Sequence, residues 1–409
     1  MIKISKEKYI LFGMIIGSTF GMASGFLWGE AMVDLVGWMG TIFLNSLKML
    51  IMPLIIFSMV TGICSLGNIK NIGWFGVKTI IYYMVTTSLA VLLGLILVNI
   101  IQPGSSSMLH STIQLPEHIR NSQGNSLSQI ITGFISPNIM ASIVNMDILP
   151  VIMFSLFLGG VLSTMEDKAQ PVIVFFQIMN DAVLKMVNII LWFSPFGIFG
   201  LIAAKIGAVG PEHFIAELNA LFKYFITVVS GLFFHGIIVL PLFYLLFTKK
   251  NPLIYLKNSL TALITAFSTA SSSATLPVTI ECTEEKNHIS TETAGFVLPL
   301  GATINMDGTA LYEAVAAMFI AQSYGIDLTL SQQVIIFFTA SLAAIGAAGI
   351  PEAGLVTMVM VLNSVGLPVE GIGMILAIDW FLDRFRTTVN VWGDMIGAGI
   401  LDKKQGPVC

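Results

Sequence analysis

Residues 268–277 read STASSSATLP and interrupt an apolar stretch of the chain with hydroxyl groups and a proline. The apolar arm before this break, Leu260–Phe267, has roughly eight residues, whereas a helix needs about 20 to cross a bilayer. A second short arm follows Pro277. Lipid offers no partners to backbone N–H and C=O groups, so broken backbone at membrane depth survives only inside protein or beside a water-filled cavity. The break therefore predicts a re-entrant hairpin.

The same design recurs nearer the C-terminus. Val334–Ala344 is apolar, residues 346–354 read GAAGIPEAG, and the apolar pattern returns over Leu355–Leu362. One such break could be an ordinary kink. Two short, interrupted segments in corresponding places are the sequence sign of an inverted-repeat transporter with its site between them.

The composition places most of the chain in a lipid bilayer. Of 409 residues, 56% are hydrophobic and only 10% are charged, whereas soluble proteins carry about 25% charged residues. The net charge of -4 is scattered, without the basic patch that nucleic-acid binding requires. The cysteines, Cys64, Cys282 and Cys409, lack metal or redox spacing, so we expect free thiols and no organic cofactor.

Long apolar segments predict membrane-spanning helices, and the first lacks a signal-peptide cleavage site, so we expect it to be retained. They are Tyr9–Trp28, Leu35–Leu66, Val77–Ile101, Val172–Ala204 and Ala220–Phe247, with shorter apolar stretches around Ile130–Leu162. The polar, Ser-rich segment Pro103–Ser128 is expected to be an external loop.

Lysines and carboxylates fall on opposite sides of these spans. Because basic residues stay on the cytoplasmic side, we expect a multi-pass protein of the cell membrane (inner or plasma membrane) with both termini in the cytoplasm. The lysines on one side are Lys3, Lys6, Lys8, Lys70, Lys249, Lys250, Lys403 and Lys404, and the acidic residues on the other are Glu30, Asp34, Glu117, Glu212 and Glu217.

Charged residues also lie within apolar stretches, where each costs at least about 2.5–3.5 kcal/mol and normally marks an ion or substrate path. They are Asp307, Glu313, Asp379, Asp383, Arg384, Arg386 and Asp394. On a helix, Asp379, Asp383, Arg386, Asn390 and Asp394 fall within an arc of about 80°, with Thr387 near its edge and Arg384 pointing away. Internal salt bridges between helices are the alternative explanation, but carboxylates outnumber the one arginine on this face.

Asn305–Thr309 places an amide, a carboxylate, a glycine and a hydroxyl inside an apolar helix. We expect Gly308 to let the helix unwind and free its carbonyl oxygens. Hard cations prefer oxygen ligands, and transporters hold sodium with such unwound carbonyls. A carrier driven by protons alone would need carboxylates but no cage of carbonyls.

Arg386 and Asp383 indicate the substrate class. A buried guanidinium binds a carboxylate with two parallel hydrogen bonds, and Asp383, one turn away, could hold an ammonium group. A positive and a negative side chain one turn apart suit aspartate or glutamate, which carry both an ammonium group and a side-chain carboxylate. In an empty site the two residues could instead neutralise each other.

The chain resembles the dicarboxylate/amino acid:cation symporter family, which includes the animal excitatory amino acid transporters and the archaeal aspartate transporters. The likeness runs along essentially the whole chain. It is carried by Lys48–Leu54, Ser194–Gly197, Ser271–Ser273 with Thr275–Pro277, Asn305–Thr309, Ala347–Gly354 and Asp379–Asp394.

The resemblance implies an all-α polytopic membrane protein with eight transmembrane helices, two re-entrant helical hairpins and inverted repeats. It also implies a homotrimer that works as an elevator-type transporter. Scaffold helices 1 and 2 would occupy residues 1–70, and transport-domain helix 3 residues 71–102. The external loop and scaffold helices 4 and 5 would occupy 103–206. Residues 207–409 would hold helix 6, hairpin 1, helix 7, hairpin 2 and helix 8 of the transport domain.

The resemblance also implies site residues. Substrate would contact Ser272, Thr309, Ile350, Gly354, Asp383, Arg386, Thr387 and Asn390. One sodium ion would be held by Gly301, Asn305, Asn390 and Asp394, and another by Tyr83, Thr86, Thr87, Asn305 and Asp307. A third would be held by backbone oxygens of Thr303, Ala344, Ile345 and Ala347.

Particular positions resemble the animal branch of the family more than the archaeal one. Ala270 stands where archaeal members carry an arginine, and Arg384 occupies the alternative position used by the animal transporters. Glu313 matches the glutamate that the family links to proton cotransport and potassium return. We therefore expect proton co-transport through Glu313 and potassium counter-transport. Glu352 departs from the expected glutamine, and we have no physical account of it.

Other functions remain open from the sequence. The nearest is a proton-driven symporter of glutamate or C4-dicarboxylates with the same fold. A neutral amino acid exchanger would leave Arg386 without a partner carboxylate, and a passive ion pathway could exist beside transport. An intramembrane hydrolase would need a base beside one of its serines, and the candidate base, His235, has no obvious orienting carboxylate in the sequence.

Overall fold

The computed structural model describes residues 6–65, 69–106, 132–210, 213–346, 349 and 353–402. Those residues form helices and turns and contain no strand, in agreement with the all-helical fold class. Most of the predicted external loop, and the positions Ala347, Ile350 and Glu352, lie outside the described residues.

The first half of the chain, apart from α3 and η1, consists of helices that pack mainly on one another. Its elements are α1 (Lys6–Trp28), α2 (Ala31–Ser65), α3 (Ile69–Ile101), η1 (Pro103–Ser106), α6 (Ile139–Val144), α7 (Ile148–Thr164), η3 (Glu166–Ala169), α8 (Gln170–Trp192) and α9 (Ser194–Val209). Both α1 and α2 pack against α9, and α2 also packs against α7 and α8. Glycines let α1 approach α9 closely, since a Cβ at Gly21 would lie 3.0 Å from the carbonyl oxygen of Phe199.

The predicted single span Val172–Ala204 is wrong. The helix α8 ends at Trp192, and α9 begins at Ser194 with Pro195 in its first turn. Proline has no backbone N–H and its ring clashes with the preceding turn, so it starts a new helix more readily than it continues an old one.

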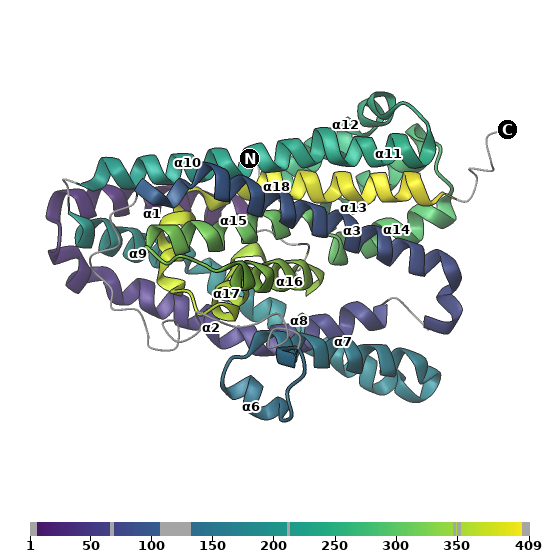
Figure 1. Ribbon diagram of the computed structural model, residues 1–409, viewed down its shortest axis with the longest axis horizontal. Helices are drawn as coiled ribbons and strands as arrows, with labels where there is room; N and C mark the ends of the chain where they lie inside the picture. The colour runs from purple at the N-terminus through teal and green to yellow at the C-terminus, as the bar shows by residue number, and fades with distance from the viewer. Residues whose placement is uncertain are drawn as a thin grey trace.

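The second half of the chain surrounds a long central helix, α18. Its elements are α10 (Phe214–Phe234), the π-helix η5 (His235–Val239), α11 (Leu240–Thr248), α12 (Pro252–Thr269), α13 (Ser272–Glu281), the π-helix η6 (Cys282–Lys286), α14 (Thr291–Ile304), α15 (Asp307–Ser323), α16 (Leu330–Gly346), α17 (Ala353–Ser364), η7 (Val369–Gly371) and α18 (Ile372–Leu401). The helix α18 packs against α10, α11, α12, α14 and α15 (Figure 1). From the first half, α3 packs mainly on α15, α10 and α16.

Both predicted breaks separate a pair of helices. The first lies at Ala270, whose φ of 50° is left-handed, and Ser271 caps the N-terminus of α13 by accepting a hydrogen bond from the N–H of Ala274. The short arm expected at Leu260–Phe267 is wrong in length, because α12 begins at Pro252, where Asn251 caps it. The second break separates α16 from α17. The two tips meet, since Ser271 Oγ donates to the carbonyl of Gly349 at 2.6 Å.

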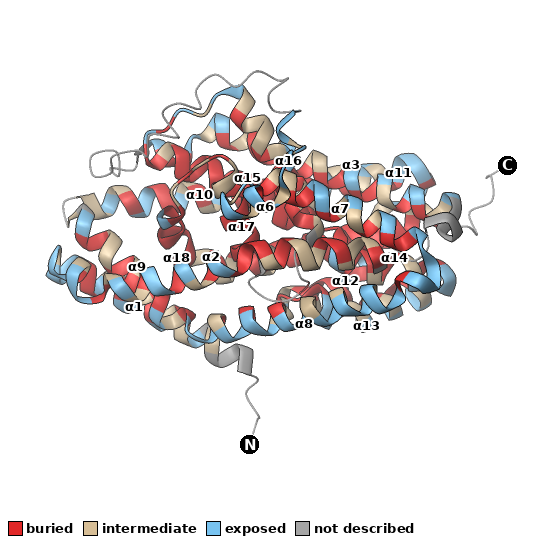
Figure 2. Cartoon of the chain, turned by 90° about the horizontal axis from the view of Figure 1, so that it is seen from below, coloured by how far each residue is buried: buried red, intermediate tan, exposed pale blue. Residues whose placement is uncertain are grey.

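Within the described residues, four helical stretches are long and apolar enough to cross a membrane: Ala31–Cys64, Trp74–Ser105, Glu166–Trp192 and Phe214–Thr248. Their burial differs. The segment Glu166–Trp192 leaves most of its side chains exposed, whereas α15 and α18 are buried along most of their length (Figure 2). The polar interior therefore lies around α15 and α18.

Candidate functional site

A column of polar side chains runs through the buried face of α18. Its members are Asp379, Asp383, Arg386, Thr387, Asn390 and Asp394, all of them buried. The spacing of a helix, about 100° per residue, brings them to one side. Arg384 points elsewhere and donates from Nη1 to the carbonyl oxygens of Phe267, at 3.0 Å, and Ser268, at 2.9 Å, near the end of α12.

Arg386 is fully buried and lies between two carboxylates. Its Nη2 donates to Asp383 Oδ1 at 2.7 Å, and its Nη1 lies 3.2 Å from Asp379 Oδ1. The ring of Tyr312 lies against the guanidinium, 3.9 Å from its carbon to the ring centroid, a cation–π contact. Nε and Nη1 of Arg386 have no hydrogen-bond partner within the described part of the chain. The guanidinium thus has more N–H donors than its two carboxylate neighbours occupy.

The predicted substrate residues come from several helices that meet at this column. Asn390 Nδ2 donates to Thr309 Oγ1 at 3.2 Å and so joins α18 to α15. A Cβ at Gly354 would lie 2.8 Å from Arg386 Nη1, so the start of α17 faces the guanidinium. Ser272 is buried at the start of α13, which packs on α18. Ile350 lies outside the described residues.

The chain unwinds between α14 and α15. Asn305 and Met306 leave the helical conformation, with φ/ψ of -103°/84° and -115°/61°. The expectation that Gly308 would be the point of unwinding is wrong, because Gly308 already belongs to α15. Its N–H donates to Asn390 Oδ1 at 2.8 Å, and a Cβ here would lie 2.6 Å from the carbonyl oxygen of Arg386. Gly308 therefore allows α15 to approach α18.

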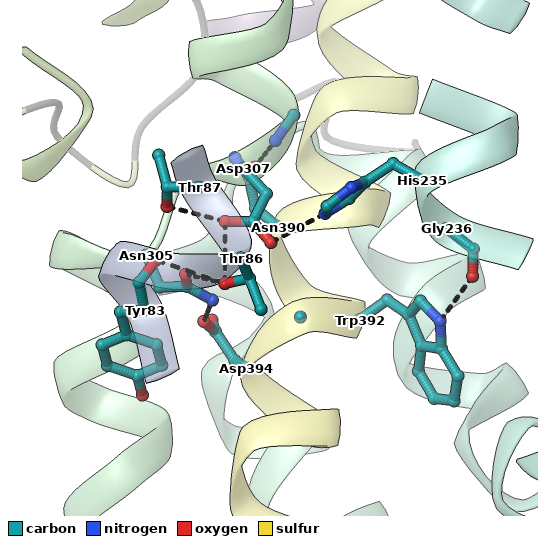
Figure 3. A network of polar contacts seen from close by, with 12 residues as sticks. Tyr83, Thr86, Thr87, His235, Gly236, Asn305, Asp307, Asn390, Trp392 and Asp394 are labelled. Atoms are coloured by element: carbon teal, nitrogen blue, oxygen red, sulfur yellow. Dashed lines mark hydrogen bonds and ion pairs between the residues drawn. The ribbon is translucent and has the colours of Figure 1, made fainter. Parts of the chain in front are cut away.

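Oxygen-bearing side chains of α3, the unwound segment and α18 form a connected cluster (Figure 3). Asp307 Oδ1 accepts from Thr87 Oγ1 at 2.7 Å and from Thr86 Oγ1 at 3.3 Å. Thr86 Oγ1 also lies 3.4 Å from Asn305 Oδ1, and Asn305 Nδ2 donates to Asp394 Oδ1 at 3.0 Å. Asn305 therefore joins the two side-chain sets that were expected to hold separate sodium ions.

Tyr83 and Gly301 border the same cluster. The carbonyl of Tyr83 lies 3.2 Å from Thr86 Oγ1, while its phenol donates to the carbonyl of Val297 at 2.7 Å. A Cβ at Gly301 would meet the carboxylate of Asp394 and would lie 2.8 Å from the phenol oxygen of Tyr83. The donor set of carboxylates, amides, hydroxyls and carbonyls is the one that hard cations prefer.

Comparison with known proteins decides the family. The model of the sodium:dicarboxylate symporter family matches residues 8–404. The chain is 40% identical to excitatory amino acid transporter 5 of Mus musculus over 88% of its own length and 75% of the relative's. It is 39% identical to excitatory amino acid transporter 3 of Oryctolagus cuniculus over 97% and 86%, and 41% identical to the Homo sapiens transporter 3 over 89% and 78%.

The chain belongs to the sodium:dicarboxylate symporter family. Membership makes it a membrane transporter rather than an enzyme, and its long apolar helices are those of a multi-pass protein. The resemblance inferred from the sequence motifs is thereby confirmed.

The third predicted sodium set involves two elements that pack on each other, α14 and α16. Ala344 is buried near the end of α16, and Ile345 follows it. Thr303, near the end of α14, turns its hydroxyl back to the carbonyl of Leu300 at 2.9 Å. Ala347 lies outside the described residues.

Glu313 lies fully buried in α15 of the symporter, one helical turn beyond Thr309. Thr357 of α17 and Arg386 of α18 are the polar groups that act on its carboxyl group.

Sequence reasoning missed two partners in the symporter site. It expected no orienting carboxylate for His235, which is wrong, because His235 Nε2 lies 3.0 Å from Asp307 Oδ2. It also did not anticipate Tyr312 against Arg386. In both cases the partners lie on different helices, and no motif spacing joins them.

Proposed function

We propose that the protein is a secondary active symporter of the acidic amino acids L-glutamate and L-aspartate, driven by the sodium gradient. The observation that carries this proposal is Arg386, a fully buried guanidinium that lies between Asp379 and Asp383 and whose Nε has no hydrogen-bond partner among the described residues. A carboxylate is the ligand that a buried guanidinium fits, through two parallel hydrogen bonds.

The substrate's charges match the charges of the pocket. The side-chain carboxylate of the amino acid binds Arg386, and its ammonium group binds Asp383, which lies one turn away. Thr309, Thr387 and Asn390 are the polar neighbours that complete the pocket. Ser272 and Gly354 of the two hairpins border it, and Ile350, outside the described residues, stays a proposed substrate contact. The names of the relatives support this substrate class, since the excitatory amino acid transporters are named for amino acids.

Sodium ions are transported together with the amino acid in the proposed mechanism. Asn305, Asp307 and Asp394, with the hydroxyls of Thr86 and Thr87, supply oxygen ligands from three parts of the fold. Gly301 and Asn390 join Asp394 in one proposed sodium site. The carbonyl of Tyr83 joins Asp307 in the other. The oxygens at the ends of α14 and α16, from Thr303, Ala344, Ile345 and Ala347, are the proposed third site. The family description supports sodium as the driving ion.

Transport would proceed by an elevator movement within a homotrimer. Residues 71–102 and 207–409 would form the moving domain, and residues 1–70 and 103–206 the scaffold, with both termini in the cytoplasm. The packing supports this division, since α3 contacts α15, α10 and α16, whereas α1, α2, α7, α8 and α9 pack mainly among themselves. The exposed face of α8 offers apolar surface that a neighbouring subunit would cover.

Glu313 is the proposed carrier of a co-transported proton and the residue through which potassium returns. Its support is its complete burial in α15, because a neutral carboxyl group avoids the cost of a buried charge. When a substrate carboxylate occupies Arg386, the protonated form is favoured further, since two carboxylates repel each other.

Ligand binding to the purified protein tests the substrate class. In sodium chloride, L-aspartate and L-glutamate should raise Tm in proportion to occupancy, as any ligand specific for the folded state does. Succinate has no ammonium group for Asp383, and L-alanine has no side-chain carboxylate for Arg386, so each should raise Tm far less. A larger shift with succinate than with either acidic amino acid would instead favour a C4-dicarboxylate symporter.

A further inference from the structure

His235 lies at membrane depth in a distorted turn between α10 and α11. It is fully buried and opens the π-helix η5. The N–H of Leu240 bonds to the carbonyl of His235, five residues earlier, which widens the turn by one residue. Wide turns of this kind are rare inside helices and are frequent at functional sites.

The wide turn presents two groups, on opposite sides, to partners on other helices (Figure 3). The carbonyl of Gly236 accepts a hydrogen bond from Trp392 Nε1 at 2.8 Å, which ties the turn to α18. The imidazole of His235 reaches the other way, and its Nε2 lies 3.0 Å from Asp307 Oδ2. Trp392 therefore forms one hydrogen bond between the turn and α18, and His235 separately contacts Asp307 of the oxygen cluster.

The hydrogen-bond roles follow from the chemistry of the pair. As a sodium ligand Asp307 would be ionised and could only accept, so in the proposed site Nε2 of His235 carries the hydrogen that is donated to Asp307. The other ring nitrogen, Nδ1, has no hydrogen-bond partner within the part of the chain that the structure describes. The only hydrogen bond of the imidazole found there is thus the one to Asp307.

The two oxygens of Asp307 consequently face different partners. Oδ2 is held by His235, while Oδ1 faces Thr86 and Thr87 on α3. A hydrogen bond at Oδ2 fixes the rotation of the carboxylate plane about its χ2 bond, which is otherwise broad. Oδ1 is then turned toward the place where the oxygens of α3 and Asn305 converge.

We propose that His235 is a positioning residue that orients Asp307 as a sodium ligand. The inference rests on the proposed function, in which Asp307 holds sodium. Outer partners of metal-binding groups set ligand orientation, and their loss typically weakens metal affinity about 10- to 100-fold. A purely structural role for His235 would change the stability of the protein without a selective loss of sodium affinity.

Different replacements of His235 place a hydrogen-bond donor at different positions, so they distinguish a positioning role from a purely structural one. Glutamine carries its N–H group about where Nε2 lies, asparagine is one methylene shorter, and leucine has no donor. Trp392→Phe is the matched control, because it removes the other hydrogen bond of the same turn and leaves Asp307 its partner. Tm of the purified full-length proteins is measured against sodium chloride at constant ionic strength in choline chloride, and its concentration dependence gives the sodium affinity.

We expect His235→Leu and His235→Asn to weaken sodium affinity by about 10-fold or more. His235→Gln should stay within about twofold of the unsubstituted protein. Trp392→Phe should lower Tm at every sodium concentration and leave the affinity unchanged. At sodium concentrations that saturate each variant, the affinity for L-aspartate should be the same in all of them.

Three results would overturn the inference: an unchanged sodium affinity in His235→Leu, a glutamine variant as weak as leucine, or an equal loss in Trp392→Phe. Each of these leaves the proposed function standing, since the unsubstituted protein still binds sodium. A protein whose Tm does not respond to sodium at all would contradict the proposed function itself, and the role of His235 with it.

Discussion

Arg386 Nη2 donates to Asp383 Oδ1 at 2.7 Å across one turn of α18. The pair places a buried cation and a buried anion side by side, and Asp379 lies 3.2 Å from the other terminal nitrogen of the guanidinium. Two carboxylates thus share one guanidinium. A zwitterionic ligand with a further carboxylate can pair with both signs of charge, its carboxylate with Arg386 and its ammonium group with Asp383.

The first prediction concerns Arg386→Lys. Lysine keeps the positive charge but loses the fork of donors, so we expect the affinity for L-aspartate to fall by about 100-fold, since hydrogen bonds to charged groups contribute about 1.5–3 kcal/mol each. Calorimetric titration of the purified variant in sodium chloride measures the change. Stabilisation by sodium in the absence of substrate is the control and should persist. Unchanged affinity in the lysine variant would show that the carboxylate binds elsewhere.

A second prediction tests the contact between α15 and α18. In Gly308→Ala, the new methyl group would lie 2.6 Å from the carbonyl of Arg386 and 2.9 Å from its Cα, both backbone atoms. We expect a loss of about 1–3 kcal/mol in stability, the usual cost of overpacking, and weaker substrate binding. Gly295→Ala in α14 is the matched control, because nothing lies within 4 Å of its added Cβ. Equal Tm values for the two variants would contradict the close approach.

Asp394 is the subject of the third prediction. In Asp394→Asn, the carboxylate that accepts from Asn305 Nδ2 is lost, so sodium should stabilise the protein only at concentrations about 10-fold higher or more. Asp402→Asn, at the far end of α18, serves as the control. Asp402 accepts hydrogen bonds from Ser290 and Thr293, outside the oxygen cluster. Asp402→Asn should lower Tm but leave the sodium dependence of Tm unchanged. If Asp402→Asn weakened the response to sodium and Asp394→Asn did not, Asp394 would not be a sodium ligand.

The fourth prediction is the role of Glu313. Glutamine keeps the size of the side chain but cannot carry a proton as a carboxyl group does. We expect Glu313→Gln to take up labelled substrate at a rate that no longer depends on external pH or on internal potassium. Uptake into vesicles over a range of external pH, with and without internal potassium, provides the measurement. A variant that keeps the dependence of the unsubstituted protein on both would rule out Glu313 as the coupling residue.

Local sequence signals were sufficient for the broken helices and the polar column. Glycine, serine and proline mark the breaks between α12 and α13 and between α16 and α17 because few other residues tolerate such turns. The polar column on α18 follows from helical spacing alone, since residues three and four apart share a face. These features depend on neighbours along the chain.

Contacts between distant segments could not be predicted in this way. His235 and Asp307 are 72 residues apart, and the imidazole reaches the carboxylate from a π-turn that leaves no mark in an apolar sequence. The unwinding point was misplaced for a similar reason. Gly308 was taken as a helix breaker, but its missing side chain makes room for the backbone of Arg386 on another helix.

Uptake into proteoliposomes under one gradient at a time tests the central claim most directly. Purified protein is reconstituted, and labelled L-aspartate or L-glutamate is supplied with an inward sodium gradient or an inward proton gradient, beside vesicles that contain Arg386→Ala. We expect the labelled amino acid to accumulate only when the sodium gradient is imposed, and not in vesicles that contain Arg386→Ala. Accumulation driven by the proton gradient without sodium would contradict the assignments of Asn305, Asp307 and Asp394 as sodium ligands.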